Sequence, residues 1–177
     1  MTEWIALLRG VNVGGVSIRS ADLRAVFEDV GCREVRAVLA SGNVVFDLDV
    51  PVSGRERLKG VIEAALRSSF DYDAWIVLVT AAELRAAVDA FPFDGADSTR
   101  QPWVVFCVDD ATRDELVAAA ASFDTDADPV APGPGVVYWN PVTGTTVDTP
   151  FAKLLARAAY KPRTTNRNLR TLLRILR

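Results

Sequence analysis

The chain contains no histidine and only two cysteines, Cys32 and Cys107. The absence of histidine excludes Ser-His-Asp and Cys-His triads, imidazole general bases and nearly every catalytic zinc site. Two isolated cysteines form neither a disulfide framework nor a CxxC pair. No apolar run approaches the roughly 18 residues that cross a bilayer, and the N-terminus lacks the basic region and apolar stretch of a signal peptide. We therefore expect a cytoplasmic protein without metal, cofactor or membrane association.

Charge is present but unevenly distributed. The 177 residues carry a net charge of −3, and 50% of them are hydrophobic, which is an ordinary globular composition. Residues 151–177 contain eight lysines and arginines and no acid, which leaves residues 1–150 with a net charge of −11. This asymmetry indicates either a basic surface for an anionic partner or a basic segment that is paired with acids or simply solvated.

The first half of the chain alternates apolar strands with amphipathic helices. The pattern predicts strands at 4–8, 35–39, 43–48 and 75–79, and helices at 20–31 and 55–70. The resulting order, βαββαβ, is the split-βαβ or ferredoxin-like arrangement. Cys32 follows the glycine that ends the first helix and is expected to be partly exposed.

The second half has a similar but less regular pattern. It predicts helices at 83–91 and after a Thr112–Glu115 capping box, strands at 103–108 and 136–139, and two basic amphipathic helices near 151–160 and 166–177. We therefore predict an α+β fold of two subdomains. Residues 1–80 form the ferredoxin-like subdomain, and residues 81–177 form a smaller α+β unit closed by the two C-terminal helices.

A glycine-rich loop that includes Gly10, Gly14 and Gly15 follows the first strand. Consecutive glycines expose backbone N–H groups that can bind an anion, and Arg9 and Asn12 can add side-chain donors. A phosphate-binding loop of the nucleotide-hydrolysing kind is not expected, because valine stands where its lysine must be. Alternatively, the glycines serve only the turning of the backbone. Arg9 itself is expected to face a cleft, or else to form a structural ion pair with an acid.

The turn Ser41-Gly42-Asn43 is a second candidate. The first and third strands of a split-βαβ sheet are antiparallel neighbours, so Asn43 is expected close to Arg9 and Gly10. The alternative is a hairpin turn that needs Gly42 for its backbone angle and Asn43 for local hydrogen bonds.

The C-terminal segment is a third candidate. Thr165 or Asn166 is expected to cap the last helix, which would place Arg167 and Asn168 in its first turn. The free N–H groups and the dipole at a helix N-terminus favour an anion.

Several segments, taken in order, resemble a bacterial family known as domain of unknown function 1697. They are residues 6–15 (ALLRGVNVGG), Leu23-Arg24, residues 41–46 (SGNVVF), residues 137–139 (VYW) and residues 165–171 (TNRNLRT). This chain has Leu169 where the family usually has tryptophan, and Val16 where a polar residue is frequent. The resemblance implies an α+β fold of two subdomains and no established activity, substrate or cofactor.

Our first hypothesis is binding of an anionic, phosphate-bearing small molecule between the subdomains. The expected ligand-binding residues are Arg9, Gly10, Asn12, Gly14, Gly15, Ser41, Asn43, Arg167 and Asn168. The alternatives are nucleic-acid binding through the basic C-terminal helices and, less favoured, an enzyme that acts on a bound anion without histidine.

Overall fold

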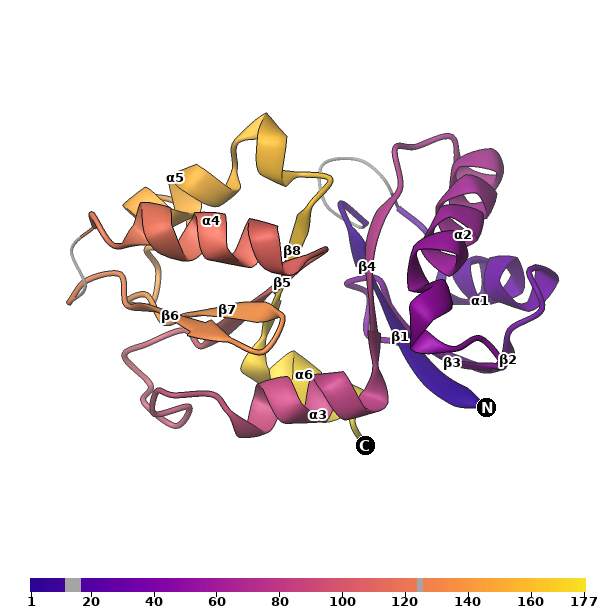
Figure 1. Cartoon of the computed structure of the whole chain (residues 1–177), viewed down its shortest axis with the longest axis horizontal. Helices are drawn as coiled ribbons and strands as arrows, with labels where there is room; N and C mark the ends of the chain where they lie inside the picture. The colour runs from indigo at the N-terminus through magenta and orange to yellow at the C-terminus, as the bar shows by residue number, and fades with distance from the viewer. Residues whose placement is uncertain (12–16, 124–125) are drawn as a thin grey trace. The chain divides into compact units, whose positions relative to one another are not determined.

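The chain divides into two compact units, Met1–Ala82 and Glu83–Arg177. The computed structural model describes residues 1–11, 17–123 and 126–177. Each unit combines α-helices with one four-stranded antiparallel sheet (Figure 1). The chain therefore has the predicted α+β fold of two subdomains. No helix in the described ranges has the length and apolarity that crossing a bilayer requires.

The first unit has the predicted βαββαβ order. Its elements are β1 (Thr2–Arg9), α1 (Ser20–Asp29), β2 (Arg33–Val38), β3 (Asn43–Leu48), the short 3-10 helix η1 (Val52–Gly54), α2 (Arg55–Phe70) and β4 (Trp75–Thr80). The strands lie in the order β2-β3-β1-β4, so β1 is central and antiparallel to both of its neighbours. This is the strand order of a ferredoxin-like sheet.

The core of the first unit lies between one face of the sheet and the two helices. Trp4, Ala6 and Leu8 alternate along β1 and pack in one cluster with apolar residues of α1 and α2. On α2 these residues include Ile62 and Leu66, four residues apart on one helical face and fully buried. Burial of each such side chain contributes about 1.5–3 kcal/mol, so this seam holds α2 on the sheet.

The second unit contains the same topology with two added helices. Its elements are α3 (Ala81–Asp89), β5 (Trp103–Cys107), α4 (Asp110–Ala120), β6 (Val130–Gly133), β7 (Val136–Trp139), α5 (Pro150–Leu155), the 3-10 helix η2 (Ala158–Tyr160), β8 (Thr164–Asn168) and α6 (Leu169–Ile175). The strand order β6-β7-β5-β8 matches β2-β3-β1-β4 position by position. This unit is longer than the first, and not smaller as expected, because α3 and α6 are added to the shared frame.

The strand registers of the two units also correspond. Leu8 donates its backbone N–H to the carbonyl of Gly42 at 2.8 Å, and Cys107 donates to Gly135 at 3.4 Å. Both glycines have positive φ, +72° and +71°. Counting from these pairs, β1 corresponds to β5, β3 to β7 and β4 to β8, residue for residue. The chain is therefore an internal structural duplication.

The predicted C-terminal helices are wrong in extent. The segment near 151–160 is the short α5 followed by η2, and the segment near 166–177 is the strand β8 followed by α6. Thr164 and Thr165 are β-branched, and they pair with Cys107 and Phe106 of β5, so tertiary pairing decides their conformation. The N-cap of α6 is Asn168, whose side chain accepts the backbone N–H of Arg170 at 3.0 Å.

The strand β6 was not expected, because its segment is rich in proline and glycine. It lies at the edge of the second sheet, where the missing N–H of Pro132 removes no bond that a central strand would need.

Candidate functional site

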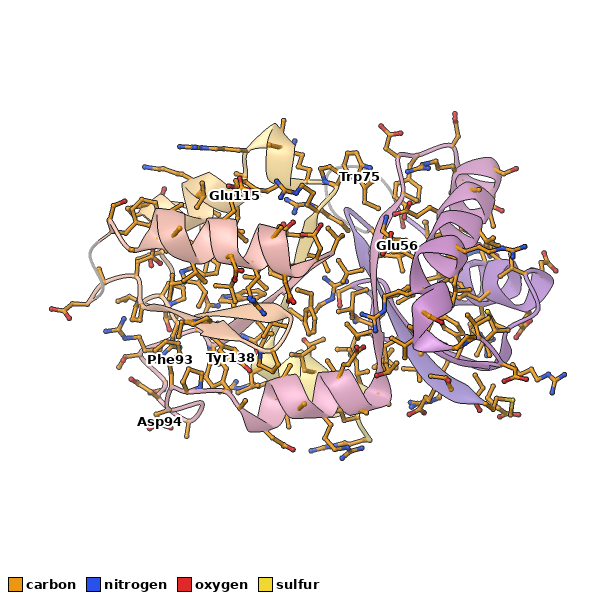
Figure 2. All side chains as sticks on the ribbon, viewed as in Figure 1. Glu56, Trp75, Phe93, Asp94, Glu115 and Tyr138 are labelled. Atoms are coloured by element: carbon orange, nitrogen blue, oxygen red, sulfur yellow. The ribbon has the colours of Figure 1, made fainter. Side chains whose placement is uncertain are left out.

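Arg9 lies at the carboxyl end of β1, and its register partner is Trp75 at the start of β4. Trp75 is labelled in Figure 2. The side chain of Arg9 is half-buried, and burial lowers the pKa of the guanidinium. Gly10 follows in the left-handed region, φ +78°, and is exposed. A charged donor and an exposed backbone thus meet where the strand ends.

Asn43 and Ser41 lie beside this strand end, as the sequence predicts. Asn43 is the register partner of Leu7, and the preceding residue, Gly42, accepts a hydrogen bond from Leu8. A Cβ on Gly42 would lie 2.9 Å from the Cβ of Leu8, so only glycine allows this approach.

The side chain of Asn43 stabilises the hairpin itself. It is fully buried, and its Nδ2 donates to the carbonyl of Val38 at 2.8 Å and to the hydroxyl of Ser41 at 2.9 Å. Both amide hydrogens are therefore used inside the turn, which is the structural alternative that the sequence offered. Ser41 remains exposed at the surface of the turn.

Three of the predicted ligand residues, Asn12, Gly14 and Gly15, lie outside the described residues. The predicted anion-binding loop therefore stays a prediction for those positions.

Arg167 is a buried residue of β8 and not a residue of a helix N-terminus. Its exposed fraction is 7%, and its Nη1 donates to the hydroxyl of Thr165 at 2.8 Å and to the carbonyl of Asn166 at 2.9 Å. Burial lowers the pKa of Arg167 to about 10. The charged form is thus held in surroundings that solvate it poorly.

Because the two units share one strand topology, each arginine can be compared with the residue at the equivalent position of the other unit. Arg167 corresponds to Val79 of β4, since they pair with the equivalent residues Val104 and Ile5. Both positions are buried. In the same way, Arg9 corresponds to Val108, which follows the equivalent of Leu8. A valine satisfies each position in one of the units, so neither arginine is demanded by the fold.

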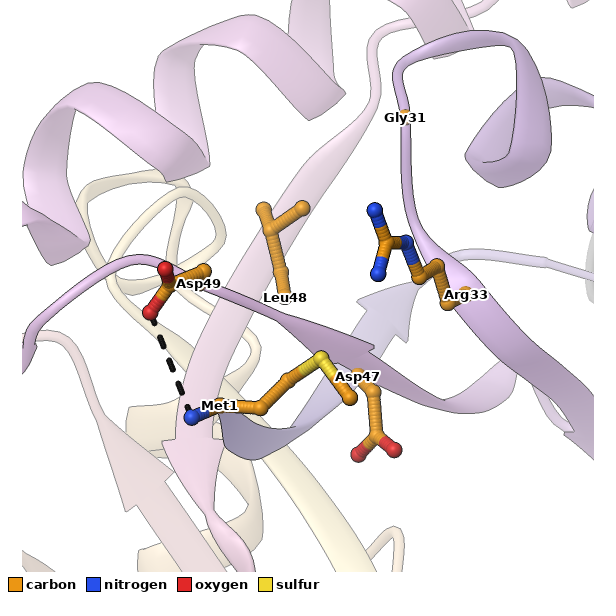
Figure 3. A pocket seen from close by; sticks show the side chains of 6 residues that line it. All are labelled: Met1, Gly31, Arg33, Asp47, Leu48 and Asp49. Atoms are coloured by element: carbon orange, nitrogen blue, oxygen red, sulfur yellow. Dashed lines mark ion pairs between the residues drawn. The ribbon is translucent and has the colours of Figure 1, made fainter.

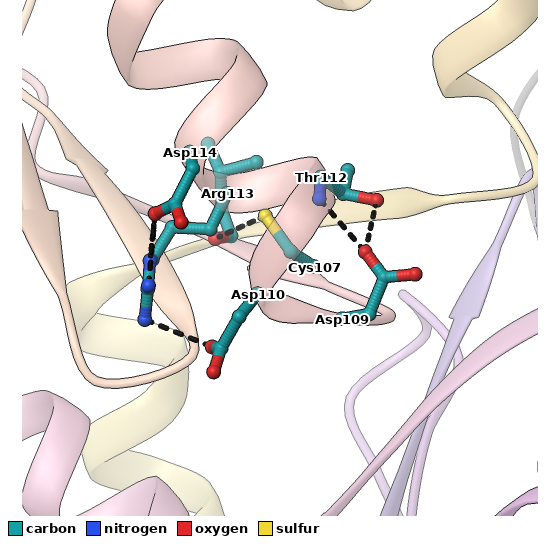
Figure 4. A network of polar contacts seen from close by, with 7 residues as sticks. Cys107, Asp109, Asp110, Thr112, Arg113 and Asp114 are labelled. Carbon is teal, nitrogen blue, oxygen red and sulfur yellow. Dashed lines mark hydrogen bonds and ion pairs between the residues drawn. The ribbon is translucent and has the colours of Figure 1, made fainter.

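The start of α4 carries a satisfied polar network (Figure 4). Asp109 is the N-cap and accepts the backbone N–H of Thr112 at 2.7 Å and its hydroxyl at 2.6 Å. Glu115 accepts from the hydroxyl of Tyr160 at 2.8 Å and from Arg163 at 2.9 Å. The predicted Thr112–Glu115 capping box is therefore wrong, because Asp109 caps the helix and Glu115 pairs with residues that follow α5.

This network predicts that acid destabilises the second unit. Hydrogen bonds from Thr112 lower the pKa of Asp109, and those from Tyr160 and Arg163 lower the pKa of Glu115. A carboxylate with a lowered folded pKa contributes stability above its unfolded pKa, and this contribution is lost as pH falls through the folded value. We expect the urea midpoint to fall between about pH 5 and about pH 3, and to fall less in the double variant Asp109→Asn/Glu115→Gln. Equal pH dependence in both proteins would contradict this assignment.

The two cysteines are buried and poorly reactive. Desolvation raises the pKa of Cys32 to about 11, and desolvation, with a smaller effect of Asp109, raises that of Cys107 to about 12. The expectation that Cys32 is partly exposed is wrong, because its side chain packs into the core of the first unit. Thiolate chemistry at neutral pH is disfavoured at both positions.

Two cavities lie in the described part of the first unit, away from the predicted site residues. One, of about 270 Å³, is lined by Met1, Gly31, Arg33, Asp47, Leu48 and Asp49 (Figure 3). The other, of about 310 Å³, is lined by Val50, Pro51, Gly54, Arg57, Leu58 and Val61. Within residues 1–11, 17–123 and 126–177, no three cysteine or carboxylate side chains gather as a metal site would require.

Comparisons with known proteins agree with the fold and add no activity. A conserved bacterial protein, SP0830 from Streptococcus pneumoniae, has a similar solved structure, with a TM-score of 0.80 and 20% sequence identity over 99% of this chain and 97% of that chain. At this identity the likeness concerns the fold alone. Comparison with curated proteins returned no match. The family model for proteins of unknown function DUF1697 matches residues 1–138, and the chain therefore belongs to that family.

Proposed function

We propose that this protein binds an anionic, phosphate-bearing small molecule through the buried Arg167 and the half-buried Arg9. The observation that carries the proposal is Arg167, a buried guanidinium at the position that Val79 fills in the other copy of the same frame. Burying a charge where an apolar residue satisfies the fold costs stability. Such a residue is best explained by a role other than folding.

The chemistry of the ligand follows from the guanidinium. Because burial lowers the pKa of Arg167, its charged form is poorly solvated, and an anion beside it would stabilise that form. A guanidinium presents parallel N–H donors that match two oxygens of a phosphate group. Asn168, next along β8, uses its Oδ1 to cap α6, which leaves its amide nitrogen as a further donor.

The first unit carries a separate group of donors in the proposal. Arg9 and the exposed backbone of Gly10 lie at the end of β1, beside the exposed hydroxyl of Ser41. Asn43 acts by holding the hairpin in shape. The residue of the second unit at the position equivalent to Arg9 is Val108, so the fold does not require an arginine there.

We expect inorganic phosphate to raise the unfolding temperature of the protein, and Arg167→Val to abolish this rise. Ligand at ten times its dissociation constant stabilises a folded protein by about 1.4 kcal/mol, which a thermal-shift assay resolves. The unfolding temperature of Arg167→Val without phosphate is the reference for this variant, and its response to phosphate is measured against that value.

Arg170→Gln is the matched control, because Arg170 is exposed and lies three residues further along the chain. It should keep the response to phosphate, and potassium chloride at equal ionic strength should produce no response in any variant. Arg9→Val tests the first unit in the same assay and should weaken the response. The proposal fails if phosphate and a nucleoside monophosphate leave the unfolding temperature unchanged, or if Arg167→Val and Arg9→Val respond like the original protein.

A further inference from the structure

We propose that an exposed basic patch on the α5–η2 segment binds the phosphate backbone of duplex nucleic acid. The patch consists of Lys153, Arg157 and Lys161, with Arg163 at its base. The first three side chains are exposed, and among the described residues they form no ion pair with an acid. The segment 151–163 itself contains no aspartate or glutamate.

The backbone of the segment gathers these cations closely. Tyr160 donates its N–H to the carbonyl of Arg157 at 3.0 Å, and Arg163 donates to the carbonyl of Tyr160 at 3.1 Å. These short-range bonds fold residues 157–163 into a compact turn. Lys153 lies about one helical turn earlier, on α5.

The patch rests on a rigid base. Tyr160 is 6% exposed, and its hydroxyl donates to Glu115 of α4. Arg163 donates to the hydroxyl of Thr112 at 3.1 Å and stacks over the ring of Tyr160, with its guanidinium carbon 5.7 Å from the ring centroid. Because these contacts already hold the turn in the free protein, its backbone loses little conformational entropy on binding.

The chemistry of the patch favours a duplex over other polyanions. Recognition of single strands uses exposed aromatic rings for base stacking, and the aromatic rings of this segment, Phe151 and Tyr160, are buried. None of the exposed large apolar side chains belongs to this segment, so it offers nothing to insert into a lipid surface. Lysine and arginine side chains that have no exposed aromatic rings beside them suit contacts with the regularly spaced phosphates of a duplex backbone. Such contacts do not depend on the base sequence.

The same unit carries a second basic group that serves as a control. Arg170, Arg174 and Arg177 are also exposed and also number three. The helix α5 packs on the sheet face that contributes Val105 and Val137 to the core, whereas α6 lies on the other side of this sheet (Figure 1). Neutralising either group changes the net charge equally, so only the position of the charges differs.

The test is fluorescence anisotropy with a labelled DNA duplex of about 20 base pairs, at about 50 to 200 mM salt. Three phosphate contacts predict a slope of log affinity against log salt near −2.7, or about 40-fold weaker binding over this range. Lys153→Gln/Arg157→Gln/Lys161→Gln should bind at least about tenfold more weakly at the lowest salt, and Arg170→Gln/Arg174→Gln/Arg177→Gln within about threefold of the original protein. Circular dichroism melts confirm that both variants fold.

The inference is overturned if no duplex binds at the lowest salt, or if the two triple variants lose affinity equally. It is also overturned if a single strand, or vesicles containing phosphatidylserine, bind as tightly as the duplex and respond to the same variant. None of the six residues substituted in this assay belongs to the proposed phosphate site, so the outcome of the phosphate thermal-shift assay has no bearing on this one.

Discussion

Replacing Glu63 by alanine is expected to destabilise the first unit by about 3–5 kcal/mol, because it breaks a buried charge network. Glu63 lies on α2 and is 7% exposed. Its Oε1 accepts the backbone N–H of Ile76 on β4 at 3.0 Å and the ammonium of Lys59 at 2.8 Å. Alanine would leave a buried strand N–H and a partly buried ammonium without their partner.

Urea unfolding followed by circular dichroism measures the effect. Glu56→Ala is the control, since Glu56 is an exposed acid in the first turn of the same helix (Figure 2). It should change stability by less than about 0.5 kcal/mol. Glu63→Gln keeps an acceptor for Ile76 but not the charge, and it should lie between these values. A loss below about 1 kcal/mol for Glu63→Ala would show that the network contributes little.

Replacing Asp128 by alanine is expected to destabilise the second unit by a similar amount, about 3–5 kcal/mol. Asp128 is 2% exposed, and its two carboxylate oxygens accept from different elements. One accepts the indole N–H of Trp139 on β7, and the other accepts the backbone N–H of Phe151 on α5 at 2.9 Å. The carboxylate therefore ties α5 to the sheet and satisfies a donor in the first turn of that helix.

Two variants make the measurement of Asp128 specific. Asp148→Ala removes an exposed acid just before α5 and should change the unfolding free energy by less than about 0.5 kcal/mol. Asp128→Asn keeps the size of the side chain but offers only one oxygen to two donors, so we expect a loss of about 1–3 kcal/mol. If Asp128→Asn costs nothing, then the size of the side chain and not the pair of acceptors would account for the effect of alanine.

The placement of the first-unit candidates was predictable from the sequence. Continuous apolar residues at β1 and helical spacing in α2 are local signals, and the βαββαβ order makes β1 and β3 neighbours. Arg9 and Asn43 were therefore expected near each other, and the register places Asn43 opposite Leu7. Asn43 donates both amide hydrogens within the hairpin, to Val38 and Ser41. These bonds depend on the positions of the two acceptors in the folded turn, which the local sequence pattern does not predict.

The strand topology of the second unit could not be predicted from the sequence. The strand β6 contains proline and is tolerated only because it lies at a sheet edge, and β8 occupies a segment whose sequence predicts the start of a helix. The sequence therefore indicates only a similar, less regular pattern in this half and not the duplication itself. Its clearest markers are paired glycines with positive φ and matching registers, which are properties of the folded backbone.

Composition and local periodicity by themselves determined the α+β class, the ferredoxin-like first unit, the absence of histidine chemistry and the uneven charge, because these properties depend on residue type and near-neighbour spacing. Only the tertiary structure decided which charges are buried. Arg167 is buried, Arg163 pairs with Glu115, and Lys153, Arg157 and Lys161 remain exposed, although all five belong to one basic segment. Burial and ion pairing depend on residues distant in the chain that the fold brings together, and the energy of a charge changes several-fold with that environment.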